Sequence, residues 1–308
     1  MGSEMCIRDS NEAGISLGTG ADFTVESDAL FYRLAESGWL GLGESYMAGE
    51  WHASDLPTVI RRLISVAYLP KKKLRASAEN DDALGIPPDL RRLAAGEHAS
   101  LQTGIFNTGI PTVTRPQPGA SIRTYSAPGD VVPADIVEAQ QRAFAILCAD
   151  IDLRSGDLVG EFGYNGAALS EVAAEMGARV EYVSADALNV EKARAAKIAG
   201  VAVSRTPFPI PAEKNRGRRY TAIVSNDYAN VLPEAEFSSF LRWGSGNLSP
   251  AGSIGIGALV RTGDHAIIDH VLQATRRYLA PTLRLPEATR LGTLVARGSG
   301  LPVRSTTV

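Results

Sequence analysis

The chain has 308 residues, of which 44% are hydrophobic, so it is long enough to bury a core in one large domain or two modest ones. Its 31 basic and 34 acidic residues give a formal net charge of −3, which does not suggest nucleic-acid binding. No apolar run reaches the roughly 18 residues that a spanning helix needs, and the 2 cysteines form no disulfide or metal-ligand pattern. We therefore expect a cytoplasmic protein without a metal site.

Residues 1–11 are interpreted as a sequence artefact or a disordered leader. The stretch MCIRDS resembles translated adapter sequence, and it lacks the apolar core of a signal peptide. Residues 12–75 are predicted to form a small N-terminal α+β domain. It contains a strand-like piece at 13–25 and helix-period segments at 28–38 and 55–67, the last with Asp55 as its N-cap.

Residues 76–133 are predicted to be a linker and irregular segment, because they are rich in Pro, Gly, Ser and Thr, with one short helix near 88–96. A basic cluster beside the helix at 55–67 suits an anionic membrane surface, which would make the protein peripheral to the membrane. The alternative is a solvated helix face and linker. The cluster consists of Arg61, Arg62, Lys71, Lys72, Lys73 and Arg75.

Residues 134–308 alternate between helix-period and strand-like segments. This alternation predicts an α/β fold with a doubly wound, Rossmann-like parallel sheet covered by helices. Strands are expected at 157–162, 179–185, 201–204, 220–227 and 253–260, and helices at 134–151, 167–177, 189–200 and 234–246.

The turn EFGYNG follows the first of these strands, where open α/β sheets place their ligands. Gly163 is expected to take a positive φ or to let a ligand approach the backbone, and Gly166 to open a helix whose free N–H groups favour an anion. The pattern is neither G-x-G-x-x-G nor a P-loop. It fits the acid, here Glu161, and the shortened glycine turn of S-adenosylmethionine (SAM) sites.

Two further polar positions follow strands on the same edge. Asp186 or Asn189 is placed to accept hydrogen bonds from ribose hydroxyls, and the alternative is that Asp186 caps the helix that follows. Asn226 and Asp227 end the strand at 220–227, either as ligand contacts or as a strand terminator.

The stretch SGWLGLGESYMAGEW, residues 37–51, closely resembles the N-terminal domain of the cyclopropane-fatty-acyl-phospholipid synthase family, which includes mycolic acid cyclopropane synthases. Further segments occur in the family's order, and the resemblance covers about residues 25–290. These segments are Tyr125-Ser126, residues 138–140, EFGYNG, SADALN and RRYLAPTLRLPE.

The resemblance implies a methyltransferase fold whose members transfer the methyl group of SAM to a cis double bond of a fatty-acyl chain. It implies SAM as the cofactor and an unsaturated fatty-acyl lipid or membrane surface as the partner. Asn165 replaces a family glycine, and Asn189 replaces a ribose-binding Gln. The cofactor-binding residues expected here are Tyr125, Ser126, Glu161, Gly163, Asn165, Gly166, Asp186 and Asn189.

The catalytic equipment of the resembled family is replaced, and no catalytic residue is assigned. The family's Cys falls on Ala127, its Glu-His pair on Ala229-Asn230, and a further His on Gly257. The chain stops where the family adds C-terminal helices, so a C-terminal truncation is expected. Three hypotheses follow: a catalytically silent paralogue acting as a homodimer or partner subunit, an active methyltransferase on unsaturated acyl chains with a rebuilt site, or a different reaction.

Overall fold

The computed structural model describes residues 14–16, 22–65, 104–129, 132–164, 166–207, 220–261, 266–278 and 280–308. The chain divides into two compact units. Unit 1 is formed by Met1–Leu90 with Gly263–Leu283, and unit 2 by Arg91–Thr262 with Arg284–Val308. This differs from the division expected from the sequence, in which 134–308 form one domain, because a late segment of the chain belongs to the first unit.

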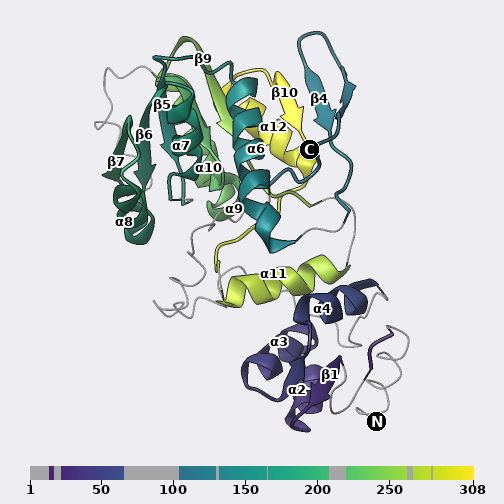
Figure 1. Ribbon diagram of the computed structural model, residues 1–308. Helices are drawn as coiled ribbons and strands as arrows, with labels where there is room; N and C mark the ends of the chain where they lie inside the picture. The colour runs from purple at the N-terminus through teal and green to yellow at the C-terminus, as the bar shows by residue number, and fades with distance from the viewer. Residues whose placement is uncertain are drawn as a thin grey trace. The chain divides into compact units, whose positions relative to one another are not determined.

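In its described residues, unit 1 contains a two-stranded antiparallel sheet and the helices α2, α3, α4 and α11; Figure 1 shows their order along the chain. Its core is centred on Trp51, which is 1% exposed and stacks on Phe23 at 4.3 Å between ring centroids. The elements are β1 (Phe23–Val25), α2 (Ala29–Ser37), α3 (Trp39–Met47), β2 (Trp51–Ala53), α4 (Leu56–Ser65) and α11 (Ala266–Tyr278).

The glycine-rich part of the N-terminal signature has a packing role. A Cβ atom added to Gly41 would lie 2.0 Å from the carbonyl oxygen of Arg33, so only glycine lets α3 approach α2 this closely. The Trp51 Nε1–H donates to the carbonyl oxygen of Leu42 at 3.0 Å and fixes the indole against α3. The signature thus specifies the fold of unit 1.

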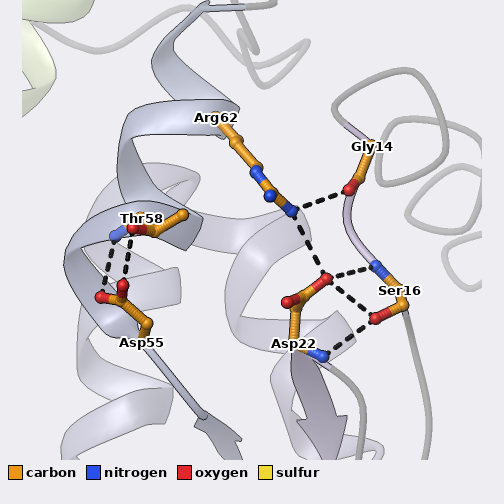
Figure 2. A network of polar contacts seen from close by, with 6 residues as sticks. All are labelled: Gly14, Ser16, Asp22, Asp55, Thr58 and Arg62. Atoms are coloured by element: carbon orange, nitrogen blue, oxygen red, sulfur yellow. Dashed lines mark hydrogen bonds and ion pairs between the residues drawn. The ribbon is translucent and has the colours of Figure 1, made fainter.

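Side-chain hydrogen bonds hold α4 within unit 1 (Figure 2). Asp55 accepts from the Thr58 N–H at 3.2 Å and from its hydroxyl at 2.7 Å, which confirms the predicted N-cap. Arg62 Nη1 donates to the carbonyl oxygen of Gly14 at 2.8 Å and lies 3.4 Å from Asp22 Oδ2. Arg62 is thus hydrogen bonded inside the unit.

Arg61 is exposed on α4, and the four other members of the basic cluster, at 71–75, lie outside the described residues, as does the helix predicted near 88–96. In the described part of the chain, no helix is both long and apolar enough to cross a bilayer. Contact with a membrane surface stays a prediction.

Helix α11 joins unit 1 through Glu44 of α3. The Tyr278 hydroxyl donates to Glu44 Oε1 at 2.6 Å, and Arg277 Nε lies 3.2 Å from the same oxygen. Glu44 is the acid of the ESYM stretch, to which the sequence alone assigns no chemistry. Its position explains why a segment more than two hundred residues later packs with the N-terminal helices.

Glu44→Ala is expected to loosen α11, because it removes both the acceptor for Tyr278 and the ion pair with Arg277. A loss of about 1 kcal/mol in local stability corresponds to roughly fivefold faster amide hydrogen exchange in 266–278. Glu36→Ala, on the exposed face of α2, is the matched control and should leave this exchange unchanged. Equal exchange in both variants would show that Glu44 does not hold the helix.

Unit 2 is built on a five-stranded parallel sheet in the order β7-β6-β5-β8-β9, which confirms the predicted Rossmann-like fold. The apolar runs expected to be strands form it, although the last strand begins five residues earlier than expected. The strands are β5 (Leu158–Phe162), β6 (Arg179–Ser184), β7 (Val201–Arg205), β8 (Tyr220–Ser225) and β9 (Leu248–Ile256).

Helices cover both faces of this sheet (Figure 1). α6 (Ile136–Asp150) and α7 (Ala168–Glu175) pack on the face that carries Val159 and Val180. α10 (Glu234–Gly246) and α12 (Ala288–Ser299) pack on the opposite face, against Phe162 and Ile223. α8 (Ala187–Ala196) connects β6 to β7, and the short α9 (Tyr228–Val231) follows β8. The doubly wound arrangement predicted for this region is therefore confirmed.

A second, three-stranded sheet lies in a region expected to be irregular. β4 (Ser121–Thr124) pairs antiparallel with β3 (Thr112–Thr114) and parallel with β10 (Ser305–Thr307). β3 has three residues, all of them exposed, so its Thr-Val-Thr alternation is too short to indicate a strand and no face of it is buried. A 3-10 helix at Pro133–Asp135 then leads into α6. The description of 76–133 as linker therefore misses two of these strands.

Candidate functional site

The turn that follows β5 lies at the carboxyl edge of the sheet, at its topological switch point. β5 is the central strand, with β6 on one side and β8 on the other, so the chain leaves β5 in one direction and later returns on its opposite side. Ligands of open α/β sheets bind at this place, because the loops after the two neighbouring strands diverge there. The residues that meet at this point are Gly163, after β5, and Asp227, after β8.

Gly163 is needed for close approach and not for its backbone conformation. The positive φ values of the turn are found at Gly166 (69°) and Ala167 (72°), so the expectation of a positive φ at Gly163 is wrong. A Cβ atom added to Gly163 would lie 2.7 Å from Asp227 Oδ1 and 3.2 Å from its Cγ. A side chain of the protein itself therefore occupies the space beside this glycine.

The backbone of the turn is hydrogen bonded to side chains from the neighbouring strands. The Tyr164 N–H donates to Asp227 Oδ2 at 2.6 Å. The Tyr182 hydroxyl accepts from the Gly166 N–H at 3.1 Å and lies 3.2 Å from the Gly163 carbonyl oxygen, to which it donates. The Gly166 N–H is therefore engaged, and anion binding by the amides at the start of α7 stays a prediction.

Asp227 is a buried carboxyl group, only 3% exposed. Burial is the main cause that raises its pKa to about 7; the nearby Glu161 raises it further, and the hydrogen bond from the Tyr164 N–H opposes the shift. Among the described residues its Oδ1 atom has no hydrogen-bond partner. Burial thus brings the pKa of this group to about 7, and one of its oxygens lies buried at the switch point without a partner in that part of the chain.

Glu161 is the last residue but one of β5 and is completely buried. Its Oε2 atom accepts a hydrogen bond from the Ser170 hydroxyl, which holds α7 against β5. Together with burial, its charge raises the pKa of the Cys148 thiol to about 12, so that this cysteine is an unreactive core residue. The observed role of Glu161 is structural, and contact with a cofactor stays a prediction.

Asp186 caps α8. Its Oδ1 accepts from the Asn189 N–H at 3.0 Å, so the capping alternative for Asp186 is confirmed. Both residues are half-buried at the end of β6, on the same edge as the turn. The capping bond engages one carboxylate oxygen of Asp186 and the backbone of Asn189. Ribose recognition by either side chain stays a prediction.

Tyr125 and Ser126 are held by the smaller sheet. The Tyr125 N–H donates to the carbonyl oxygen of Val308 at 2.8 Å, and the Ser126 carbonyl oxygen accepts from Asn107 Nδ2 at 3.2 Å. No hydrogen bond between described residues links this pair to the turn. Asn165, the remaining residue of the expected site, lies outside the described residues.

Aromatic and acidic side chains complete the edge around the turn. The Tyr164 ring lies 5.7 Å from the Tyr228 ring, centroid to centroid. Burial, followed by the charges of Asp227, Asp186 and Glu236, raises the pKa of Tyr164 to about 12. These acids come from three different elements, so the edge carries negative charge.

Asn230 of α9 is a structural residue at this edge. It is fully buried, and its Nδ2 donates to the carbonyl oxygens of Leu259 at 2.8 Å and Arg284 at 2.7 Å. Its Oδ1 accepts from the Leu259 N–H at 2.9 Å. Asn230 stands where the resembled family has its catalytic His, and its amide is saturated by these bonds.

Sequence reasoning missed Tyr164 and Tyr182 and left Asp227 undecided. Tyr182 lies inside a strand, so its sequence position indicates a core residue, but its hydroxyl accepts a hydrogen bond from the turn after β5. The available signal for Asp227 is its position after a buried strand, because carboxyl ends of parallel strands share one edge. The strand order was needed to place it beside Gly163.

Gly163→Ala is expected to destabilise the protein by about 2 kcal/mol, because the added methyl group displaces the Asp227 carboxyl and breaks its bond to the Tyr164 N–H. The free energy of unfolding in urea measures this loss. Gly292→Ala in α12 is the control: its Cβ meets nothing within 4 Å, and alanine favours a helix. An unchanged stability for Gly163→Ala would mean that Asp227 does not pack on the turn.

No group of three or more His, Cys, Asp and Glu residues arranged for a metal ion occurs in the described ranges. His98 and His265 lie outside those ranges. His270, on α11 of unit 1, is buried, and desolvation lowers its pKa.

No protein-family model matches the sequence, and no curated protein matches it. Among solved structures, the cyclopropane synthase MmaA2 from Mycobacterium tuberculosis is 14% identical, over 70% of this chain and 70% of its own, with a TM-score of 0.48. Mycolic acid cyclopropane synthase CmaA1, solved with S-adenosylhomocysteine (SAH) and CTAB, is 13% identical over 70% of each chain, with a TM-score of 0.47.

Coclaurine N-methyltransferase, bound to N-methylheliamine and SAH, is 14% identical over 93% of this chain and 74% of its own, with a TM-score of 0.46. At these identities the likeness concerns the fold alone. The Rossmann-like class itself is established by the parallel strands of this chain and their order.

Proposed function

We propose that this protein is a divergent cyclopropane-synthase-like member of the SAM-dependent methyltransferase class that binds SAM at the switch point and lacks cyclopropane-synthase catalysis. The observation that supports the cofactor half of the proposal is the glycine turn at the carboxyl end of β5, which lies beside Asp227 at the end of the neighbouring strand β8. The resemblance of residues 37–51 and of the later segments supports the lipid context. A cytoplasmic location and a role as a homodimer or partner subunit belong to the same proposal.

Asn230 supports the absence of this catalysis. A residue that holds a catalytic base must have a hydrogen-bonding group directed at that base. The side-chain amide of Asn230 is instead hydrogen bonded to the backbone of Leu259 and Arg284. The neighbouring position is Ala229, which has no polar side chain. The two positions where the resembled family has Glu and His therefore offer no group to a base.

A second candidate, an active methyltransferase on unsaturated acyl chains with a rebuilt site, is favoured by one observation. Asp227 has a pKa of about 7, the range in which a carboxylate accepts a proton efficiently at neutral pH. It lies beside Tyr164 and close to Tyr228, whose rings suit a cationic intermediate. In this reading Asp227 would take the proton that the resembled enzymes pass to a bound base.

Two measurements test the proposal. Titration calorimetry with SAM is expected to give saturable binding, and no heat at millimolar SAM would contradict it. Incubation with methyl-labelled SAM and vesicles that contain oleoyl phospholipid is expected to leave the lipid unlabelled. Label in the lipid fraction of the wild-type protein would instead establish the second candidate.

A further inference from the structure

The carboxyl edge of the sheet carries acidic side chains from three elements. Asp227 follows β8, Asp186 follows β6, and Glu236 lies in the first turn of α10. The charges of all three raise the pKa of the Tyr164 phenol. Asp186 has a capping role, and Glu236 is exposed. Asp227 is the member of this set that is buried beside the glycine turn.

The Asp227 carboxyl is only half used by the protein. Oδ2 accepts a hydrogen bond from the Tyr164 N–H, whereas Oδ1 lies 2.7 Å from where a Cβ atom of Gly163 would be and makes no hydrogen bond within the described ranges. No basic side chain in those ranges lowers its pKa, and Glu161 raises it. A buried carboxylate without a countercharge is costly, so a cation brought to Oδ1 by a ligand would be bound favourably.

We propose that Asp227 is a recognition residue for the α-ammonium group of the amino-acid moiety of SAM or SAH, seated against the Gly163 turn. The proposal rests on the proposed function and deepens it. The Oδ1 atom of Asp227 fills the space beside Gly163, so an ammonium group that reaches this turn meets its negative charge directly. Adenosine ligands that lack the ammonium group are then discriminated against.

The test uses three ligands that share the adenosine thioether. SAH carries both the ammonium and the carboxylate, its deaminated analogue keeps only the carboxylate, and 5′-methylthioadenosine has neither group. The wild-type protein is expected to bind the deaminated analogue at least tenfold more weakly than SAH. This comparison requires no mutation and therefore does not depend on the folding of a variant.

Asp227→Asn is the matching substitution, because asparagine keeps an acceptor for the Tyr164 N–H and removes the charge. The substitution is expected to weaken the binding of SAH at least tenfold and to leave the affinity for 5′-methylthioadenosine unchanged. Asp152→Asn is the control for loss of a carboxylate: Asp152 is exposed with a φ of 55°, which asparagine tolerates. It should bind SAH like the wild type.

Equal binding of SAH and its deaminated analogue by the wild type would overturn the inference, as would unchanged SAH affinity in folded Asp227→Asn. Both results leave SAM binding itself intact. If no adenosine ligand binds the wild type at millimolar concentration, the proposed function fails and the inference fails with it.

Discussion

Asn230→Ala is expected to lower the free energy of unfolding by about 3 kcal/mol, since it removes three hydrogen bonds that a fully buried side chain makes to backbone groups, each worth about 1 kcal/mol. The groups are the N–H and carbonyl of Leu259 and the carbonyl of Arg284. The substitution thus releases two segments at once, the one after β9 and the one before α12. Urea denaturation followed by circular dichroism measures the loss.

Asn247→Ala is the matched control for this substitution. The Asn247 side chain is half-buried and donates one hydrogen bond, to the carbonyl oxygen of Trp243 at 2.7 Å. Its removal is expected to cost about 1 kcal/mol. A loss for Asn230→Ala that is no larger than this would show that Asn230 does not hold the edge together.

Asn230→His extends the same reasoning to catalysis. It restores the residue type of the resembled family, yet an imidazole has too few donors and acceptors to replace the bonds to Leu259 and Arg284. We expect a destabilised protein that does not label oleoyl phospholipid from methyl-labelled SAM. Labelling by this variant would mean that the lost His is the sole cause of inactivity.

The stability of the wild type is expected to fall as the pH rises from 4 to 7, because of Asp227. Its pKa is about 7 in the folded protein against an ordinary value of 3.8, so over this range the folded state keeps a proton that the unfolded state has released. Each pH unit then costs about 1.4 kcal/mol, and the loss approaches roughly 4 kcal/mol above pH 7. This stability is fully present below pH 3.8.

Asp227→Asn isolates this contribution, because other titrating groups act in both proteins. The difference in unfolding free energy between variant and wild type should move in favour of the variant between pH 4 and pH 8. Tyr164 does not interfere, since its pKa of about 12 keeps the phenol neutral throughout. Parallel pH profiles for the two proteins would refute the assignment of a buried, titrating carboxyl at this position.

Much of the fold of unit 2 follows from local patterns. The runs that became β5 and β8 are largely apolar because both faces of each strand are buried. The helices between them show the helical period because one face packs on the sheet. By contrast, β3 and β10 are short and without a buried face, so nothing in their sequence distinguishes them from loop.

The candidate site is predicted less completely, since its chemistry depends on pairs distant in sequence. The EFGYNG turn, its place after a central strand and the cap at Asp186 are short-range features. The contact of Asp227 with Gly163 spans more than sixty residues, and that of Tyr182 with Gly166 links β6 to the turn after β5. Neither pairing has a sequence signal until the strand order is known.

The sequence by itself determined the alternation of strands and helices, the position of the glycine turn and the resemblance of its segments to cyclopropane synthases, because such patterns lie within a few neighbouring residues. The tertiary structure alone decided what surrounds the turn. In the folded chain, the buried carboxyl of Asp227 lies beside Gly163, and Asn230 is hydrogen bonded to two segments distant in sequence. Glu44 holds α11 in unit 1. Such contacts join residues that only the folded chain brings within hydrogen-bonding distance.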